Sequence, residues 1–561
     1  MFLRVQRNGD REYLLIVENQ WQDGKVRQHV LHRLGRLDEL RASGQLDQLM
    51  LSMQRFSERL AVLGEAGQGA AMSTSAQRIG PPLIFERLWR EVGMPELLGE
   101  LLAERKFEFP VERAIFLTVL HRLLAGGPRS DRAAEKWRAD YRIKGVGEVD
   151  LQHLYRAMAW LGSELPAGQQ AWATPFSPRC TKDRIEEELF ARRRDLFTDL
   201  SLAFFDTTSL YFEGEGGASI GQYGHSKDHR PDLKQMVVGM VLSGEGRPVC
   251  SEMWPGNTTD TKTLLPVVDR LTKRFGINQV CVVADRGMIS RDTVASLEAN
   301  PAGLSYILGA RLHSDSEVRD TVLGWGGSYH EVHGPREHSK SPSPLKVKDI
   351  RFTGEDGRDR RYVVCHNEEQ AIKDRMDREA IVKSLEDQLK GGAKSLVGNK
   401  GYRKYLACQG EKVFGIDYAK VKEEARFDGK WVLRTNRFDC EAAEIALRYK
   451  DLWMVEDIFR TTKSVLQTRP IFHKCDQTIR GHVFCSFLAL VLRKALEDQL
   501  AAAGQTLEWG DILRDLDAMV QMKLCVGGKA YTLRTGSQGV AGKVFAACRM
   551  AVPAMLEEPA K

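Results

Sequence analysis

Hydrophobic and polar positions change period along the chain, and the first change separates an alternating segment from a helical one. Residues 1–37 contain an apolar run at Tyr13–Val17, an Asp-Gly turn at Gln22–Lys25 and a second run from Val26. Two alternating runs around such a turn predict a β-hairpin. From residue 38 to about residue 165, leucine and alanine recur at spacings of three and four, which predicts helices.

The next stretch of the chain has the pattern of a mixed sheet. Short apolar runs alternate with amphipathic stretches in the order β-β-β-α-β-α-β. Three antiparallel strands followed by strands with helical crossovers predict an α/β fold. The expected strands are Leu202–Phe205, Met236–Leu242, Pro248–Trp254, Val280–Ala284 and Ser305–Gly309, and the expected helices are Asp260–Phe275 and Arg291–Asn300.

Residues 312–435 interrupt this rhythm. They are rich in glycine, lysine and arginine, with strand-like pieces at Arg361–Cys365 and Gly429–Arg434 and one charged helix at Glu369–Lys390. The segment is too long for a loop, so it predicts an inserted β-rich subdomain. Helices resume near Cys440. We therefore divide the chain into a hairpin module (1–37), a helical region (38–178), a first core segment (179–311), the insertion (312–435), a second core segment (436–505) and a C-terminal region (506–561).

The composition is that of a globular protein. The 561 residues are 42% hydrophobic and 28% charged, and their net charge of +6 permits a nucleic-acid partner without requiring one. The ten cysteines contain no C-x-x-C pair, which indicates reduced thiols. No signal peptide is recognisable, and the longest uncharged apolar run, Val483–Leu492, is too short to span a bilayer. We expect a cytoplasmic protein without membrane contact.

Three acidic residues stand out by their positions. Asp206 and Asp285 each follow an apolar strand directly. Residues at strand ends line the site of an α/β sheet, and two neighbouring aspartates can hold hard divalent cations. Tyr449, Glu456 and Lys463 are spaced by seven residues in a helical stretch, and seven residues are nearly two turns, so we expect them on one face. Taken singly, such residues are more often turn, cap or exposed residues.

In combination, these residues carry a family resemblance. Tyr449, Glu456 and Lys463 match a Tyr-x2-Arg-x3-Glu-x6-Lys signature, although Leu452 stands at the arginine position. The chain resembles the DDE-type insertion-sequence transposases of the IS-four superfamily, and most of all the longer members with a β-rich insertion. Further matching stretches are Gly224–Gln235, Pro255–Thr263, Ala284–Met288 and Asp428–Asn436.

The resemblance implies an RNase H-like core, in which a mixed sheet is flanked by helices, with the β-rich insertion and a helical N-terminal DNA-binding region. Asp206, Asp285 and Glu456 would coordinate two Mg²⁺ or Mn²⁺ ions, and the catalytic helix would lie in 436–505. One ion activates the attacking water or 3′-hydroxyl and the other stabilises the leaving 3′-oxygen.

The same resemblance implies the activity. The protein would bind the ends of an insertion sequence and cleave and transfer DNA strands in cut-and-paste transposition, which in relatives passes through hairpin ends. Its partners would be the terminal inverted repeats, the target DNA and a second copy of the chain in the synaptic complex. Its place would be the bacterial cytoplasm, at the nucleoid when bound to DNA.

Several side chains are candidates for contact with DNA. The resemblance gives phosphate contacts to Tyr449 and Lys463, whereas Leu452 cannot donate to an anion. Arg460 lies one turn after Glu456 and can compensate. Further candidates are the cations between the first two strands and two tryptophans that can stack a flipped base; the alternatives are solvated cations and core tryptophans. These residues are Lys227, Arg230, Lys234, Trp325 and Trp431.

One further metal pattern and two further functions need weighing. His473, Cys475, His482 and Cys485 are nominally four zinc ligands, but their spacing is unusual and Cys485 lies in an apolar helix, so we do not expect zinc. The chain can also be a catalytically inactive or domesticated DNA-binding derivative, or an RNase H-like nuclease without strand transfer. The three carboxylates argue against the first, and the N-terminal regions and the insertion favour end recognition over simple cutting.

Overall fold

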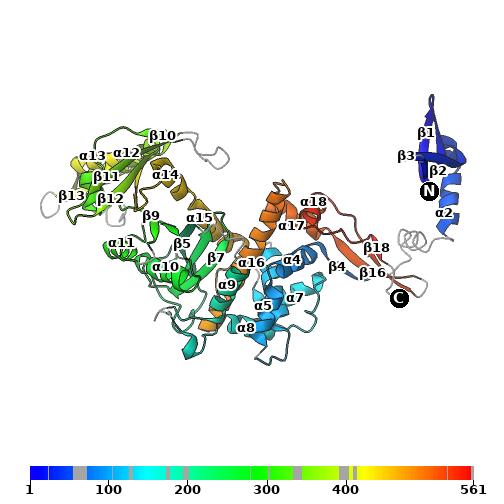
Figure 1. Cartoon of the computed structure of the whole chain (residues 1–561), viewed down its shortest axis with the longest axis horizontal. Coiled ribbons are helices and arrows are strands. Elements are labelled where there is room, and N and C mark those ends of the chain that lie inside the picture. Colours follow the sequence, from blue (N-terminus) through cyan, green and yellow to red (C-terminus); the bar gives the residue numbers. More distant parts are fainter. Residues whose placement is uncertain are drawn as a thin grey trace. The chain divides into compact units, whose positions relative to one another are not determined.

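A computed structural model gives the architecture, whose helices and strands are labelled in Figure 1. The chain divides into two compact units. Unit 1 consists of Met1–Pro81, Asp140–Arg142 and Leu507–Lys561, and unit 2 of Pro82–Ala139 and Ile143–Thr506. The structure describes residues 1–557 except 23–24, 55–72, 104, 125–129, 172, 174–176, 194–200, 278–279, 301–302, 333–343, 391–402, 409–413 and 527–528.

Unit 1 begins with a three-stranded antiparallel sheet. Its strands are β1 (Phe2–Asn8), β2 (Arg11–Gln22) and β3 (Lys25–Arg36). The pairing of β2 with β3 confirms the predicted hairpin, and β1 is a further strand that pairs with β2. The helices α1 (Leu37–Ala42) and α2 (Gln45–Gln54) follow.

A second sheet of unit 1 has the strand order β18-β17-β16-β4. Its end strand β4 (Ser73–Arg78) falls where the sequence predicted helix, so that prediction is wrong there. The Ser-Thr-Ser-Ala-Gln-Arg segment carries no apolar helical stripe, and pairing with β16 satisfies its backbone. The other elements are α17 (Trp509–Asp517), β16 (Val520–Val526), β17 (Lys529–Arg534), α18 (Ala541–Ala547) and β18 (Leu556–Glu557).

Helices dominate the first part of unit 2, as predicted. The helix α6 is buried along most of its length and packs against α8 and the long helix α16. Glycines allow α8 and α16 to cross closely, because a Cβ at Gly481 would overlap the Met158 carbonyl oxygen. The helices are α4 (Gly80–Glu91), α5 (Met94–Leu102), α6 (Val111–Leu124), α7 (Asp131–Trp137), α8 (Leu151–Leu161), α9 (Thr181–Arg192) and α16 (Asp476–Ala502).

The centre of unit 2 is a nine-stranded sheet with the order β10-β11-β12-β15-β9-β8-β5-β6-β7. Its strands β5, β6 and β7 are antiparallel, whereas β5, β8 and β9 run parallel. This is the mixed RNase H-like arrangement that the sequence predicted. The five strands are β5 (Leu202–Tyr211), β6 (Gln235–Ser243), β7 (Pro248–Pro255), β8 (Cys281–Ala284) and β9 (Ser305–Gly309).

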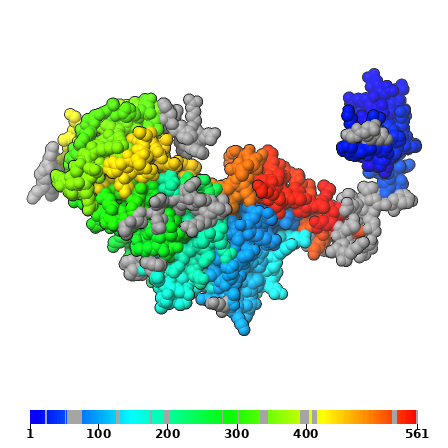
Figure 2. All heavy atoms as spheres, in the orientation of Figure 1, coloured from blue at the N-terminus to red at the C-terminus, as the bar shows by residue number. Residues whose placement is uncertain are grey.

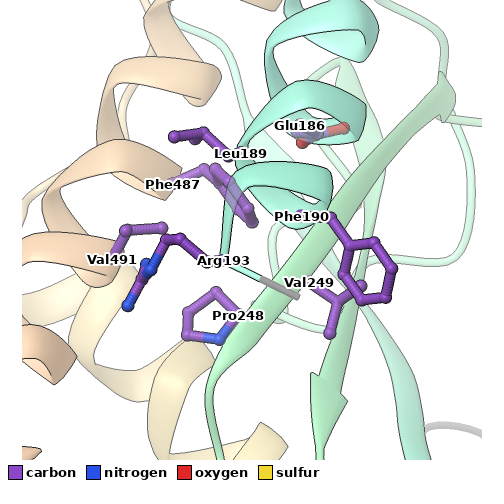
Figure 3. Close-up of a pocket in the computed structure, with 8 residues that line it drawn as sticks. All are labelled: Glu186, Leu189, Phe190, Arg193, Pro248, Val249, Phe487 and Val491. Carbon is purple, nitrogen blue, oxygen red and sulfur yellow. The ribbon is translucent and has the colours of Figure 1, made fainter. Parts of the chain in front are cut away.

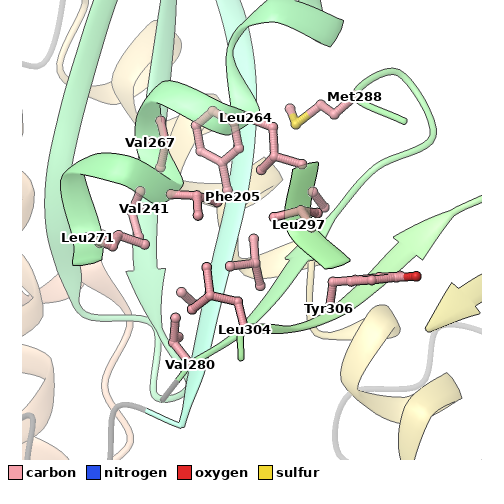
Figure 4. Packing of buried hydrophobic residues seen from close by; sticks show 14 of the residues in the cluster. Phe205, Val241, Leu264, Val267, Leu271, Val280, Met288, Leu297, Leu304 and Tyr306 are labelled. Atoms are coloured by element: carbon pink, nitrogen blue, oxygen red, sulfur yellow. The ribbon is translucent and has the colours of Figure 1, made fainter. Parts of the chain in front are cut away.

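One face of this sheet carries the main hydrophobic core (Figure 4). Phe205 and Val241 on the strands meet Leu264, Val267 and Leu271 of α10 (Leu264–Lys273). The helix α11 (Arg291–Glu298) contributes further apolar side chains. Because side chains alternate along a strand, the residues that follow Phe205 and Ala284 are not part of this core.

The insertion continues the same sheet. Its strand β15 pairs with β9 of the core, and the Asn436 side chain extends this contact by accepting from the Tyr306 N–H and donating to the Leu304 carbonyl, both at 2.8 Å. The predicted boundaries at 311 and 435 therefore lie within a continuous sheet. In Figure 2 the atoms of the core and of the insertion, coloured green to yellow, lie against each other. Other elements are β10 (His330–Val332), β11 (Leu345–Thr353), β12 (Asp359–His366), α12 (Glu368–Lys390), β13 (Leu406–Cys408), β14 (Phe414–Ile416), α13 (Tyr418–Glu424) and β15 (Lys430–Thr435).

Candidate active site

Asp206 and Asp285 lie side by side on neighbouring parallel strands. The last residues paired between β5 and β8 are Phe205 and Ala284, both buried, and each is followed by an aspartate. The pairing of β5 with β8 fixes both backbones, so Asp206 and Asp285 lie at the same level of the sheet. The structure thus brings together the two aspartates that the sequence singled out.

The Asp206 carboxylate has two other carboxylates, Asp285 and Asp260, and one cation, Lys227, close by. Burial raises the pKa of Asp206 to about 6, and the negative charges of Asp285 and Asp260 add to this effect, whereas Lys227 and the Thr207 N–H oppose it. The Thr207 N–H donates to Asp206 Oδ1 at 2.7 Å. A buried carboxylate beside two like charges is an environment that a cation stabilises. Carboxylate oxygens are also the ligands that Mg²⁺ and Mn²⁺ prefer, so the residues fit such ions.

Asp260 is a member of this site that the sequence reasoning missed. Its Oδ1 accepts from the Thr207 hydroxyl at 2.7 Å, and its Oδ2 lies 3.2 Å from Lys227 Nζ. Lys227 Nζ also donates to the carbonyl and the hydroxyl oxygen of Thr207, both at 2.8 Å. The signal was present, because Asp260 belongs to the matching stretch Pro255–Thr263. Lys227 is thus held close to Asp206, as its predicted position required.

Tyr449 reaches the same site from the helix α14 (Ala442–Lys450). Its hydroxyl donates to Asp285 Oδ1 at 2.9 Å. Burial and the neighbouring Asp285 raise the pKa of Tyr449, so the phenol keeps its proton and remains a donor. The close approach needs a glycine at 309, because a Cβ there would overlap the Tyr449 hydroxyl and lie 2.8 Å from the Arg286 nitrogen.

Gly309→Ala is therefore expected to push Tyr449 away from Asp285 and to lower the free energy of unfolding by about 1–3 kcal/mol, the usual cost of overpacking. Urea unfolding of the purified variant measures this change. Gly326→Ala is the matched control, because a Cβ at Gly326 meets nothing within 4 Å. Equal stability of the two variants would show that Tyr449 is not confined as described.

Glu456 lies on a different helical segment from Tyr449. The sequence predicted Tyr449, Glu456 and Lys463 on one face of a helical stretch, and the structure divides that stretch into separate segments. The chain turns at Asp451 and Leu452 between α14 and α15 (Trp453–Arg460), and the π-helix η10 (Thr461–Val465) follows. Both features break the 3.6-residue repeat on which the prediction depended.

The carboxylate of Glu456 is exposed, on a helix that packs against β5 and β6. Among the described residues, Asp206, Asp285 and Glu456 do not form a group whose ligand atoms all lie within 4.8 Å of one another. Leu452, at the signature arginine position, is buried and so contributes to packing.

Lys463 is paired with a carboxylate in this structure. Its Nζ lies 2.8 Å from Asp228 Oδ1, and Arg469 approaches Asp228 Oδ2 at 3.4 Å. The side chains of Lys463 and Asp228 are only 13% and 5% exposed. Burial lowers the pKa of Lys463, and Asp228 counteracts this effect.

The remaining predicted contacts are each accounted for within the protein. Arg230 pairs with Asp232 at 2.9 Å, Lys234 with Glu215 at 2.8 Å and Arg460 with Asp457 at 3.2 Å. The sequence could not show these pairs, two of which join near neighbours on a loop or a helix turn.

The two tryptophans differ in exposure. Trp431 is half-buried on β15, and its Nε1 is buried without a hydrogen-bond partner among the described residues. Trp325 is 42% exposed and stacks on Phe352 with ring centroids 5.4 Å apart. Trp431 is therefore closer to the core alternative than to a free stacking platform.

Asp206 gives the protein a predicted pH dependence. Its folded pKa of about 6 lies above the ordinary value of 3.8, so the folded state holds a proton that the unfolded state has lost, and stability falls as pH rises from about 4 to 6. Asp206→Asn removes this cost. The variant should be about 1–3 kcal/mol more stable than the wild type at pH 8 in chelator, with a smaller difference at pH 4.5. Urea unfolding at both values tests this, and a variant less stable at pH 8 would contradict it.

A crevice elsewhere in unit 2 offers no competing site. It lies between α9, β7 and α16, its walls are mostly apolar, and it has room for about one water molecule. Nearby, the carboxylate of Glu186 accepts from the Ser251 hydroxyl at 2.7 Å. The residues that line it, drawn in Figure 3, are Glu186, Leu189, Phe190, Arg193, Pro248, Val249, Phe487 and Val491.

Comparisons with known proteins identify the family of the chain. Residues 3–67 match the N-terminal domain of IS1634 family transposases, and residues 198–492, more than half of the chain, match the transposase DDE domain. The match over residues 198–492 is to the domain of a DDE-type enzyme that acts on DNA. The chain belongs to the DDE transposase family of insertion sequences.

The other comparisons are weaker. A solved piggyBac transposase synaptic complex with hairpin DNA is similar to the chain, with 10% sequence identity and a TM-score of 0.35 over 78% of this chain and 79% of that chain. No curated protein matches. In the described part of the chain, no helix combines the length and hydropathy that a membrane crossing requires.

Proposed function

We propose that the chain binds the ends of an insertion sequence and catalyses metal-dependent DNA strand cleavage and strand transfer. The observation that carries the proposal is the pair Asp206 and Asp285 at the same level of two parallel strands, with the pKa of Asp206 raised by burial and by neighbouring carboxylates. With Glu456 they would hold two Mg²⁺ or Mn²⁺ ions. Such ions activate the attacking oxygen and stabilise the leaving one.

The chain's own residues would prepare this chemistry. The Tyr449 hydroxyl donates to Oδ1 of Asp285, and Oδ2 would serve as a metal ligand. Lys227 offsets part of the negative charge at Asp206, and its Nζ contacts Thr207 and Asp260. Both contacts orient the acidic side chains before metal and DNA arrive.

Double-stranded DNA is the proposed partner, as terminal inverted repeats and as target, with two copies of the chain joining paired ends in the bacterial cytoplasm. The N-terminal sheet and helical region would recognise the ends. The positions proposed for DNA contact are Tyr449, Lys463, Arg460, Lys227, Arg230 and Lys234, whereas the half-buried position of Trp431 on β15 favours a packing role. Hairpin ends are the proposed intermediate.

The test uses the full chain with linear DNA that carries the element's own ends. With Mg²⁺ or Mn²⁺ we expect nicks with 3′-hydroxyl groups, hairpin ends and joined target products, and with chelator none of these. Binding without any cleavage would instead favour a DNA-binding derivative. Cleavage without joined products would favour a nuclease.

Lys463→Ala should weaken DNA-end binding more at low salt than at high salt, because it removes one phosphate contact. The slope of log affinity against log salt concentration should become shallower by about one unit. A titration of labelled end DNA at several salt concentrations measures this slope. Lys463→Arg keeps the charge and is the control. A loss of affinity that does not depend on salt would contradict the phosphate role.

A further inference from the structure

A second group of metal-ligating side chains lies away from the paired aspartates. Asp131 at the start of α7, His473 in the segment after η10 and His482 on α16 bring one ligand atom each to a common point. Asp131 Oδ2 lies 2.9 Å from His473 Nε2 and 3.3 Å from His482 Nδ1, and the two nitrogens are 3.1 Å apart. The three side chains are 10%, 11% and 9% exposed.

These distances fit the face of a coordination polyhedron. Ligands about 2.0–2.1 Å from Zn²⁺ in a tetrahedron are about 3.3 Å apart, and the three measured separations lie at or just below that value. Three atoms this close and equally spaced can bind one ion without moving far. Two imidazoles and a carboxylate select a transition metal over Mg²⁺.

The surroundings of His482 place a lone pair on its ligand atom, Nδ1. Its Nε2 lies 3.1 Å from the Thr468 carbonyl oxygen, which can only accept, so Nε2 carries the proton and Nδ1 has a lone pair. Burial lowers the pKa of His482 to about 4, which keeps the ring neutral. A backbone carbonyl that orients a histidine in this way is a common support of metal ligands.

Arg122 is the competitor for this position. Its NH2 lies 2.9 Å from His482 Nδ1 and 3.3 Å from Asp131 Oδ1. The guanidinium thus occupies the lone pair that an ion would use, and an ion must displace it from His482. Arg122 can keep its contact to Asp131 Oδ1, because the ion would use Oδ2.

We propose that Asp131, His473 and His482 form a binding site for a divalent transition-metal ion of the Zn²⁺ class, separate from the paired aspartates. The ion would tie the segment that carries His473 to α7 and α16. That segment also carries Arg469, which approaches Asp228. The proposal does not depend on the proposed function. Cys475 is exposed and Cys485 is not in the group, so aspartate takes the place that the sequence pattern offered to cysteine.

The test measures metal directly on the full chain after removal of metals by chelator. We expect one equivalent of Zn²⁺ to bind, a rise of the melting temperature, and a visible absorption band when Co²⁺ replaces Zn²⁺. His473→Ala and Asp131→Asn should weaken binding at least about 100-fold. Cys475→Ser and the double variant Asp206→Asn with Asp285→Asn should still bind, which separates this site from the paired aspartates.

Arg122→Met supplies an independent arm of the test. If the guanidinium competes with the ion, this variant should bind Zn²⁺ more tightly than the wild type and show the larger rise of melting temperature. The proposal is overturned if the wild type takes up no Zn²⁺ and shows no Co²⁺ band, or if binding is the same in His473→Ala. Those results would leave the cluster as a network of hydrogen bonds only.

Discussion

Asp206→Asn and Asp285→Asn are each expected to reduce the rate of metal-dependent cleavage of the DNA end by at least about 1,000-fold. A two-metal site contributes several kcal/mol of transition-state stabilisation. Each 1.36 kcal/mol of that stabilisation corresponds to a factor of about ten in rate. Asparagine keeps the shape of the side chain and removes the charge that an ion needs. The initial rate of nicking in Mg²⁺ measures the effect.

Two controls keep this result specific. Asp292→Asn changes an exposed aspartate on α11 and should cleave like the wild type. Binding of the end DNA by Asp206→Asn and Asp285→Asn should persist in a gel-shift assay, since the contacts to the phosphate backbone remain. Cleavage within about ten-fold of the wild type in either variant would remove that aspartate from the catalytic site.

Glu456→Gln is expected to lower the cleavage rate by about 100- to 1,000-fold, through the loss of the third carboxylate. Because Glu456 is exposed, this experiment separates an effect on activity from an effect on stability. A surface substitution usually changes the free energy of unfolding by less than about 0.5 kcal/mol. A loss of activity without a change of stability can therefore not come from misfolding.

The neighbouring Asp457→Asn is the matched control for Glu456→Gln. Asp457 lies on the same turn of α15 and pairs with Arg460 rather than facing a proposed ion. It should keep cleavage near the wild-type rate. If Glu456→Gln and Asp457→Asn cleave equally well, the third carboxylate must be sought elsewhere, and Asp260 is the first residue to examine.

The strands were predictable because apolar runs of strand length are local signals. Phe205 and Ala284 are buried, and an aspartate follows each of them. The prediction that Asp206 ends its strand was wrong, because β5 continues to Tyr211 and pairs with β6 along that length. The helix carrying Glu456 was not predictable to the same degree, because a turn at Leu452 and a π-helix change the register without a strong mark in the sequence.

Contacts between distant residues lay beyond the sequence. His473 and His482 are close in sequence and were noticed together, but their carboxylate partner Asp131 is on α7, far along the chain. Likewise, Asp228 belongs to a basic stretch that suggested DNA contact, and its pairing with Lys463 depends on the folded sheet. The sequence shows which side chains can bind a metal or a phosphate. Which distant residues they contact depends on the fold.

The pairing of β9 with β15 has a mechanical consequence for the insertion. The chain leaves the core after Gly309 and returns at Lys430 on the directly adjacent strand, where Thr435 also donates to the Tyr306 carbonyl at 2.6 Å. A segment attached through a hydrogen-bonded ladder cannot swing like a hinged lid unless that ladder breaks. The insertion is therefore expected to move together with the strands of the core sheet rather than as a separate body.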